Sequence, residues 1–281
     1  MAHVEGLAAG PPMDRSLRVT LNFHPDRDHH GIPLLAALAR DGVYRSQFET
    51  GTSNGGLTAQ SGGDRWRWEQ RLFGGAYDDA PTSERPKYGA LNHRRRSVGA
   101  APRFGSAHLR LAEHVLDRTT FCFPDSFFEP EHVGTSARLG LIALADAFDA
   151  EPRDDHREAT EGGRLDDYVE AHVHGVVDLR RDVEALVLDP CYRDTDVGRL
   201  AGRLQAPVEW HEGFRLDLEG VRRHPDFRGP RIVEVCEEVA VIGRLDPAII
   251  GAAVRAGHHQ AADLKKVWHL LARFGAPGAV S

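Results

Sequence analysis

Apolar and polar residues alternate along several short segments of the first two thirds of the chain, as they do along β-strands with one buried face. The clearest such segment, Asp167–Gly175, reads Asp-Tyr-Val-Glu-Ala-His-Val-His-Gly. Side chains of a strand point alternately to its two faces, so one face is expected to carry Tyr168, Glu170, His172 and His174. A carboxylate and two imidazoles in one row are costly to bury for packing alone. The strand is therefore predicted to form the floor of a functional site.

Other segments extend this pattern to a fold class. Similar alternation predicts strands at Leu17–Phe23, Val43–Phe48 and Arg103–Leu111. Apolar residues at helical spacing predict helices at Ile32–Ala39, Thr135–Phe148, Arg231–Ile242, Asp246–Ala256 and Ala262–Phe274. Together they predict an α+β fold with a mixed or antiparallel β-sheet core and a helical C-terminal portion. Residues 1–14 are expected to be a disordered tail, residues 15–190 a mostly β core that bears the site, and residues 191–281 a mostly helical portion packed on that core.

Composition narrows the classes of partner. The chain has 281 residues and a formal charge of −7, so no basic surplus favours nucleic acid as a partner. Apolar runs stay well short of bilayer-spanning length, and the start has no charged-then-apolar signal pattern. The three cysteines are scattered and form no CxxC pair, which is typical of reduced thiols. A cytoplasmic protein without membrane partners is expected.

Glu170 is the first candidate for chemistry. It is expected to act as a general base or to hold a hydroxyl of a sugar. The alternative is a structural ion pair with Arg45 or Arg110.

The two histidines that follow offer a second kind of chemistry. An HxH pair on a strand projects both imidazoles to one side and suits a zinc ion. A third ligand is needed, and His24, Asp26 or His108 could supply it. Alternatively, the backbone satisfies one imidazole and Glu170 the other, without a metal.

The segment from Glu49 to Gly75 is rich in Gly, Ser and Thr. Such loops can turn backbone N–H groups toward an anion, although a plain flexible loop has the same composition. Arg45 precedes the run and could bind a phosphate or pyrophosphate as a fork. The residues that could support the same anion are Ser46, Thr50, Thr52 and Ser53. Trp66 could add a stacking surface, as could Trp68.

Two familiar nucleotide-binding motifs are absent. The sequence contains no P-loop motif and no GxGxxG after a strand. Cys122 and Cys191 lie in apolar surroundings, so inert core thiols are expected there.

Four blocks of sequence resemble an uncharacterised bacterial family, a domain of unknown function. They are Val43–Gly56, Arg85–Asn92, Arg118–Phe121 and Tyr168–Gly175, and the resemblance extends from Leu17 to Gly275.

The chain also resembles, more loosely, the mono-ADP-ribosyltransferases. In the sequence of those enzymes, a strand with an Arg or His comes first, then a strand with Ser or Thr, and then a strand with a catalytic Glu. Arg45, then Ser106 or Thr119-Thr120, then Glu170 follow that order. His172 stands where those enzymes often have Gln or Glu, and their Ser-Thr-Ser motif is absent.

The second resemblance implies an NAD-dependent ADP-ribosyltransferase-like enzyme with an unidentified protein or small-molecule acceptor. Glu170, His172 and Arg45 would be catalytic. NAD, as a substrate, would be held by Arg45, Ser46, Thr52, Ser53, Trp66, Ser106 and His108.

Two other functions stay open from the residues alone. One is a metal-dependent hydrolase or nucleotidyl-transfer enzyme with a divalent metal on His172, His174 and His24. The other is a non-catalytic module that binds a nucleotide or a peptide.

Overall fold

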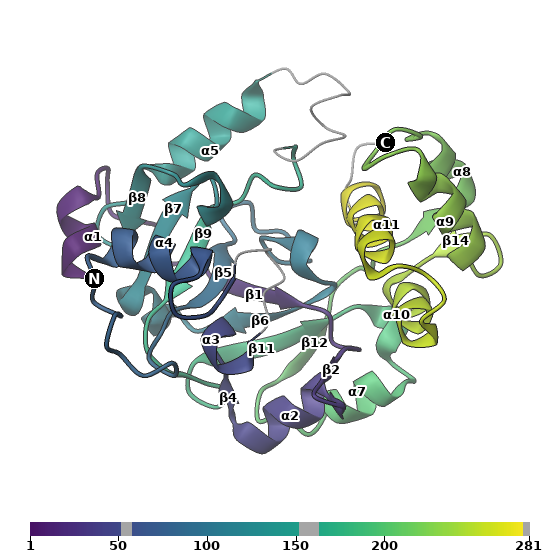
Figure 1. Ribbon diagram of the computed structural model, residues 1–281, viewed down its shortest axis with the longest axis horizontal. Helices are drawn as coiled ribbons and strands as arrows, with labels where there is room; N and C mark the ends of the chain where they lie inside the picture. The colour runs from purple at the N-terminus through teal and green to yellow at the C-terminus, as the bar shows by residue number, and fades with distance from the viewer. Residues whose placement is uncertain (52–57, 152–162, 278–281) are drawn as a thin grey trace.

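An eight-stranded sheet forms the centre of the protein in the computed structural model, which describes residues 1–51, 58–151 and 163–277 (Figure 1). Its strand order is β12-β11-β6-β1-β5-β9-β7-β8. In that order the strands are Val208–Trp210, Val183–Leu188, Ala107–Leu111, Val19–Phe23, Lys87–Leu91, Glu170–Val173, Thr119–Phe123 and His132–Thr135. Neighbours are antiparallel except for the parallel pair β11 and β12. The predicted α+β fold with a mixed sheet is confirmed.

Short two-stranded ribbons flank this sheet. They pair β2 (Asp28–His29) with β3 (Ile32–Pro33), β4 (Val43–Tyr44) with β10 (Val177–Asp178), and β13 (Leu216–Asp217) with β14 (Arg244–Leu245). Short 3₁₀ helices join the elements: η1 (Pro102–Phe104), η2 (Glu113–Arg118), η3 (Ser126–Phe128) and η4 (Pro190–Tyr192).

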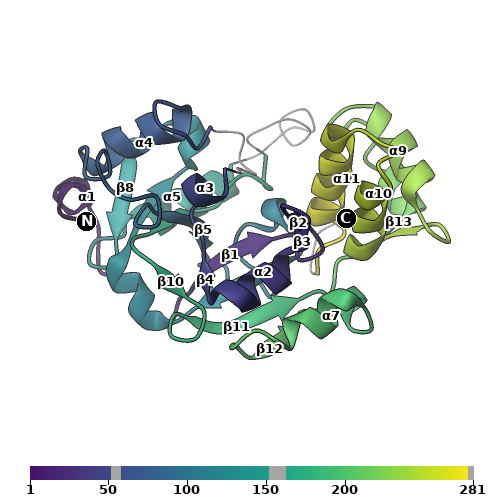
Figure 2. The same ribbon diagram turned by 60° about the horizontal axis from the view of Figure 1, so that its bottom comes forward.

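The C-terminal helices gather beside the sheet rather than over it (Figures 1 and 2). They are α8 (Leu218–Arg222), α9 (Arg231–Val239), α10 (Pro247–Ala256) and α11 (Ala261–Phe274). The helices of the sheet-bearing part are α2 (Leu34–Asp41), α3 (Gln47–Thr50), α4 (Asp64–Phe73), α5 (Leu141–Ala150) and α7 (Asp196–Ala201). The C-terminal helices have an apolar core of their own around Trp268 and Phe214. No helix in the described ranges is both long and apolar enough to cross a membrane.

The N-terminus differs from the expected disordered tail. Residues Ala2–Leu7 form helix α1. Val4 is fully buried in a cluster with Trp68 and Phe73 of α4, and Met13 packs into the main core. Burial of these apolar side chains offsets the conformational entropy lost on ordering the segment.

The two faces of the sheet have opposite character, as the alternation in Asp167–Gly175 predicted for one strand. Ala171 and Val173 of β9 join the apolar core. Glu170 and His172 point to the other face, where strand pairing places them beside Cys122, Thr120 and Tyr88. Helix α4 covers this polar face with Trp68, Phe73 and other side chains that pack on Cys122.

The sheet opens between its two halves. Strands β1 and β5 pair only at Val19 with Leu91 and at Thr20 with Ala90. In contrast, β1 pairs with β6 as far as Phe23, and β5 pairs with β9 as far as Lys87. The two half-sheets therefore stop pairing at Thr20 and Ala90, before either strand ends, and this leaves room for a cavity.

Candidate functional site

A cavity of about 200 Å³ lies in this opening. It is lined by Asn22 and Phe23 of β1, by Lys87–Gly89 of β5, and by side chains of α2, α4 and η1. Its polar and aromatic wall contains Glu170, Arg65, Tyr88, Tyr168 and Phe104. Whole-ligand pockets usually measure about 300–1,000 Å³, so this volume suits one ring-sized part of a larger ligand.

Glu170 reaches the cavity from the polar face of β9. Its carboxylate oxygen Oε1 lies 2.9 Å from His172 Nε2, and Oε2 accepts a 3.0 Å hydrogen bond from the Ser126 hydroxyl. Burial by itself raises the pKa of this carboxyl group, but His172, the Arg65 charge and the Ser126 hydroxyl together bring the pKa below its usual range. The cavity is therefore walled by a buried, ionised carboxylate.

His172 and His174 lie behind Glu170 and not in the cavity. A carboxylate only accepts hydrogen bonds, so we assign the His172 proton to Nε2. The Thr120 hydroxyl oxygen is 3.2 Å from His172 Nδ1 and 3.0 Å from His174 Nε2. The Tyr77 hydroxyl bonds His174 Nδ1. These contacts form one chain that fixes the orientation of the Glu170 carboxylate.

Arg65 of α4 is a site residue that the sequence interpretation missed. Its guanidinium is buried, lies 3.9 Å above the ring of Tyr88, and is 3.9 Å from Glu170 Oε1. Arg65 Nη1 also donates a 2.6 Å hydrogen bond to Ser126. Arg65 therefore places a positive charge beside both the catalytic candidate and an aromatic wall.

A second carboxyl group lies close by. Asp125 accepts a hydrogen bond from the Tyr168 hydroxyl, and burial together with the Glu170 charge raises its pKa to about 6. Glu170 and Asp125 thus have pKa values shifted in opposite directions. Pairs of this kind are typical of sites that move protons.

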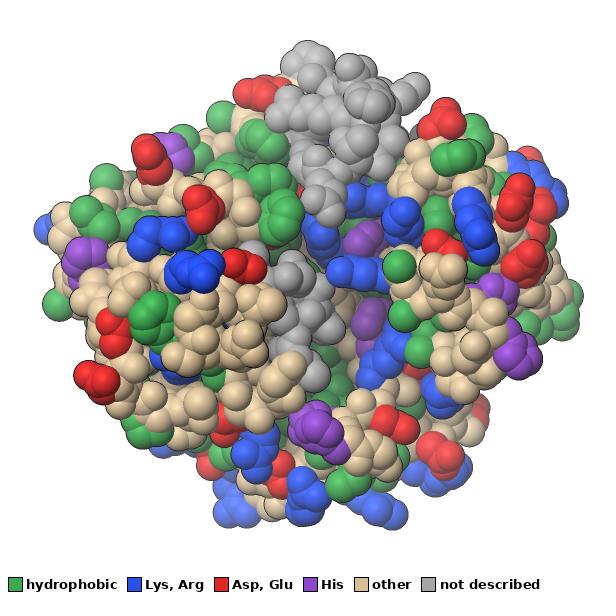
Figure 3. All heavy atoms as spheres, viewed as in Figure 1, with side chains coloured by type: hydrophobic (Ala, Val, Ile, Leu, Met, Phe, Trp, Pro, Cys, Tyr) green, Lys and Arg blue, Asp and Glu red, His purple; other side chains and the backbone are tan. Residues whose placement is uncertain are grey.

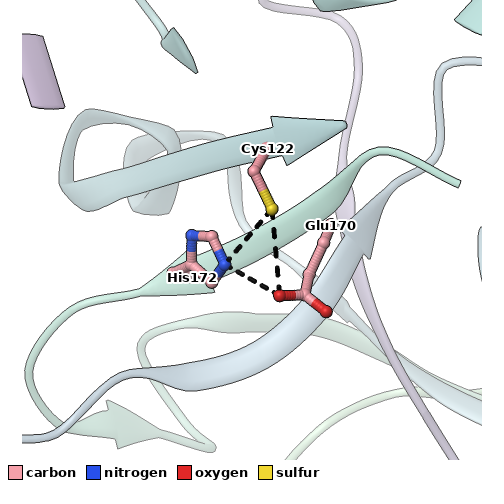
Figure 4. A group of neighbouring side chains, drawn as sticks. All are labelled: Cys122, Glu170 and His172. Carbon is pink, nitrogen blue, oxygen red and sulfur yellow. Dashed lines mark hydrogen bonds and ion pairs between the residues drawn. The ribbon is translucent and has the colours of Figure 1, made fainter. Parts of the chain in front are cut away.

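Cys122, Glu170 and His172 bring three possible metal-ligand atoms within 4.8 Å of one another (Figure 4). Cys122 Sγ is 3.8 Å from His172 Nε2 and 4.0 Å from Glu170 Oε1. Soft thiolate and imidazole donors suit zinc. Two features oppose a cation here: Arg65 lies beside the same carboxylate, and burial followed by the Glu170 charge raises the pKa of the Cys122 thiol.

The predicted ligand set His172, His174 and His24 is not assembled. His24 packs edge-on against Trp268 of α11, with ring centroids 4.9 Å apart. The strand β1 that precedes His24 is separated from β9 by β5. The sequence alone does not give this strand order, so it could not show that His24 lies away from His172 and His174.

Arg45 does not lie on a strand. Strand β4 ends at Tyr44, and Ser46 begins α3 through a capping box with Glu49. Arg45 lines the cavity mouth, but its guanidinium is 3.0 Å from Asp41 and 3.4 Å from Glu49. The Ser46 hydroxyl accepts from the Glu49 N–H in the cap and donates to the Thr82 carbonyl, so its proton is not available to a cofactor.

Among the described residues, three other predicted cofactor residues do not line the cavity. Trp66 is half-buried on α4 and is not among the cavity-lining residues. Ser106, just before β6, and His108 on that strand are buried, and β1 and β5 separate β6 from β9. Thr52 and Ser53 lie outside the described residues.

Buried neutral imidazoles predict a pH dependence of stability. Burial, with further positive groups nearby, lowers the pKa of His108 and of His174 to about 3. The unfolded chain, with an ordinary pKa of about 6.5, then binds protons first, so stability is lost as pH falls from about 6.5 toward 3. Each imidazole contributes about 2 kcal/mol between pH 7 and pH 5, and the raised pKa of Asp125 opposes this by about 1 kcal/mol.

Burial also lowers the pKa of His24 to about 3 and that of His269 to about 2, so these two imidazoles add to the loss. We therefore expect the free energy of unfolding to be lower at pH 5 than at pH 7 by at least about 3 kcal/mol. Urea titrations at the two pH values measure this difference. Equal stability at the two pH values would show that these imidazoles are not buried in their neutral form.

Comparison with known proteins places the chain in a family. No curated protein matches it. The family described as "protein of unknown function (DUF3626)" matches residues 18–150 and 141–274, which together span most of the 281 residues. The chain therefore belongs to the DUF3626 family.

Proposed function

We propose that the protein is an NAD-dependent ADP-ribosyltransferase-like enzyme with an acceptor still to be identified. The observation that carries the proposal is the ionised Glu170 carboxylate in the wall of a ring-sized cavity. A fixed negative charge at that position would stabilise positive charge that develops on a bound sugar.

The cavity supports a specific arrangement of the substrate. Tyr88, Tyr168 and Phe104 would contact the flat faces of the nicotinamide ring. Glu170 would accept a hydrogen bond from a ribose hydroxyl. The bond between ribose C1 and the nicotinamide nitrogen then breaks, its electron pair leaves with nicotinamide, and the acceptor bonds to C1 and loses its proton.

The residues around Glu170 have positioning roles in this proposal. His172 and Ser126 each hold one carboxylate oxygen, so little reorganisation is needed as charge develops. Arg45, which lines the cavity, is the candidate for the phosphate side of the ligand. A phosphate there would compete with Asp41 and Glu49 for its guanidinium.

NAD binding and nicotinamide release test the proposal together. We expect millimolar NAD to raise the melting temperature, and nicotinamide to be released when cell lysate supplies an acceptor. Heat-treated protein with the same lysate is the control for enzymes of the lysate. An unmoved melting curve together with no nicotinamide above the control would contradict the transferase.

A metal-dependent hydrolase or nucleotidyl-transfer enzyme is the second candidate. The convergence of Cys122, Glu170 and His172 favours it, with Cys122 in place of the expected His24 and His174. A metal ion would occupy the carboxylate that the first proposal assigns to ribose, so the two candidates exclude each other. Stoichiometric zinc or manganese in the purified protein would support this candidate, and its absence after purification without chelators would remove it.

A further inference from the structure

A second polar cluster lies between the sheet-bearing part and the C-terminal helices. In Figure 3, Lys, Arg and His side chains gather in the hollow between these two parts. The residues of the cluster come from separate elements: Arg103 of η1, Asp166 before β9, Arg228 before α9, and His269 of α11. The cavity at Glu170 uses none of these four residues.

His269 is the residue of this cluster that lacks an explanation. Its side chain is only 4% exposed, and neither ring nitrogen has a hydrogen-bond partner in the described part of the chain. Burial, followed by the charges of Arg103 and Arg228, lowers its pKa to about 2, so the ring is neutral and offers one donor and one acceptor. A buried polar group left unpaired costs about 1–3 kcal/mol, which indicates a partner outside the described residues.

The surroundings of His269 specify the charge of that partner. Arg103 Nη1 and Arg228 Nη2 share the buried carboxylate of Asp166, the latter at 3.1 Å. Arg228 Nε has no partner in the ranges that the structure describes. Lys265, one turn before His269 on α11, adds a further positive charge. The charges of two guanidinium groups and an ammonium group therefore act on the His269 ring, and such surroundings favour an anion as its partner.

We propose that Arg228, Arg103 and His269 form a binding site for a phosphoryl group. A phosphoryl group presents several oxygens, which can accept from Arg228 Nε–H and from the His269 N–H at the same time. A carboxylate is also an anion, but it has only two oxygens. A phosphoryl group has at least three, so it can accept from more of these donors at once. The proposal does not depend on the transferase function.

The site is held rigidly to the fold. Trp268, the neighbour of His269, donates from its indole nitrogen to the carbonyls of Pro102 and Arg103 at 3.1 and 3.0 Å. This contact fixes α11 to η1, and Phe104 of the same 3₁₀ helix lines the cavity at Glu170. Because η1 contributes to both sites, the phosphoryl group could belong to a nucleotide that extends from the cavity. It could equally be a free phosphate.

Thermal denaturation and calorimetry of the full chain with sodium pyrophosphate test the site, against sodium chloride at equal ionic strength. We expect pyrophosphate to raise the melting temperature of the wild type. Arg228→Gln and His269→Leu are each expected to weaken binding about tenfold or more. Arg222→Gln is the matched control, because this arginine is exposed and pairs with Glu237, and its response should equal that of the wild type.

His269→Leu has a second readout that a purely structural histidine would not give. Because the imidazole is unpaired, its replacement by an apolar side chain should not lower the melting temperature without pyrophosphate. A parallel titration with ADP separates the sources: tighter binding of ADP than of pyrophosphate assigns the site to a nucleotide, and equal or weaker binding assigns it to the free anion. A wild type that responds equally to pyrophosphate and chloride would overturn the proposal, as would a response that both variants retain.

The pyrophosphate test can succeed or fail independently of the test for transferase activity. Pyrophosphate binding that both variants lose, with an unmoved melting curve in NAD and no nicotinamide above the control, would support the phosphoryl site and contradict the proposed function. Release of nicotinamide with no response to pyrophosphate would do the reverse.

Discussion

Replacement of Glu170 by glutamine is expected to slow the release of nicotinamide from NAD about 10²–10³-fold. The change keeps the shape of the side chain and leaves an amide oxygen that can still accept from His172 or Ser126. It removes the negative charge that would stabilise the developing oxocarbenium ion. Initial rates of nicotinamide release, with the affinity for NAD measured by calorimetry, should show a loss in rate and an affinity within a few fold of the wild type.

The matched control for this variant is Glu184→Gln. Glu184 is a half-exposed carboxylate that pairs with Arg18 and Arg110 on the sheet, so its loss should leave the rate unchanged. A Glu170→Gln variant that retains more than about a tenth of the wild-type rate would contradict a catalytic role. Equal NAD binding by wild type and variant, with no turnover in either, would identify a binding module instead.

Replacement of Arg85 by methionine is expected to destabilise the protein by about 3–5 kcal/mol. Arg85 Nη1 lies 2.5 Å from Glu69 Oε2, and neither side chain is more than 5% exposed. Glu69 also accepts a 2.9 Å hydrogen bond from the hydroxyl of Tyr88, whose ring lines the cavity. Burial already raises the pKa of Glu69, so without Arg85 its carboxyl group is left buried with no counter-charge from that side chain, and urea denaturation measures the cost.

The double variant Glu69→Gln/Arg85→Met provides the control. A neutral amide needs no counter-charge and can still accept from Tyr88, so the double variant should lose less stability than Arg85→Met alone. A loss below about 1 kcal/mol in the single variant would place this pair in contact with solvent. The covering of the polar face by α4 would then be incorrect.

Local periodicity was sufficient to predict the strand that carries Glu170. Residues 170–173 form β9, and the period of two correctly separates Glu170 and His172 from Ala171 and Val173. Periodicity could not show that Tyr168 and Glu170 reach a cavity while His172 and His174 do not. That depends on the early end of the pairing between β1 and β5, which involves residues about 70 positions apart in the sequence.

The segment around Arg45 contains two conflicting local patterns. Alternation over Val43–Phe48 favoured a strand, but Ser46 followed by Glu49 is the pattern of a capping box. In the structure the cap prevails and α3 begins at Gln47. The guanidinium of Arg45 pairs with Asp41 at the end of α2 and with Glu49 of α3.

Arg65 and Cys122 were missed for different reasons. The buried face of α4 contains Arg65, Trp68, Glu69 and Leu72, which recur at helical spacing. The sequence therefore contained the pattern of a helix here. The Gly-rich texture before Asp64 led to a loop interpretation. Cys122 meets Glu170 because β7 pairs with β9, although 48 residues separate the two in the sequence, and no local pattern specifies strand order.

The central claim is that Glu170 faces a cavity that receives the nicotinamide end of NAD. The most direct test is a crystal structure of the Glu170→Gln variant with bound NAD, since the slow turnover preserves the ligand. The account predicts the nicotinamide ring between Tyr88 and Tyr168, with a ribose hydroxyl within hydrogen-bond distance of the substituted side chain. NAD bound elsewhere, or wild-type crystals with a metal ion held by Cys122, Glu170 and His172, would contradict it.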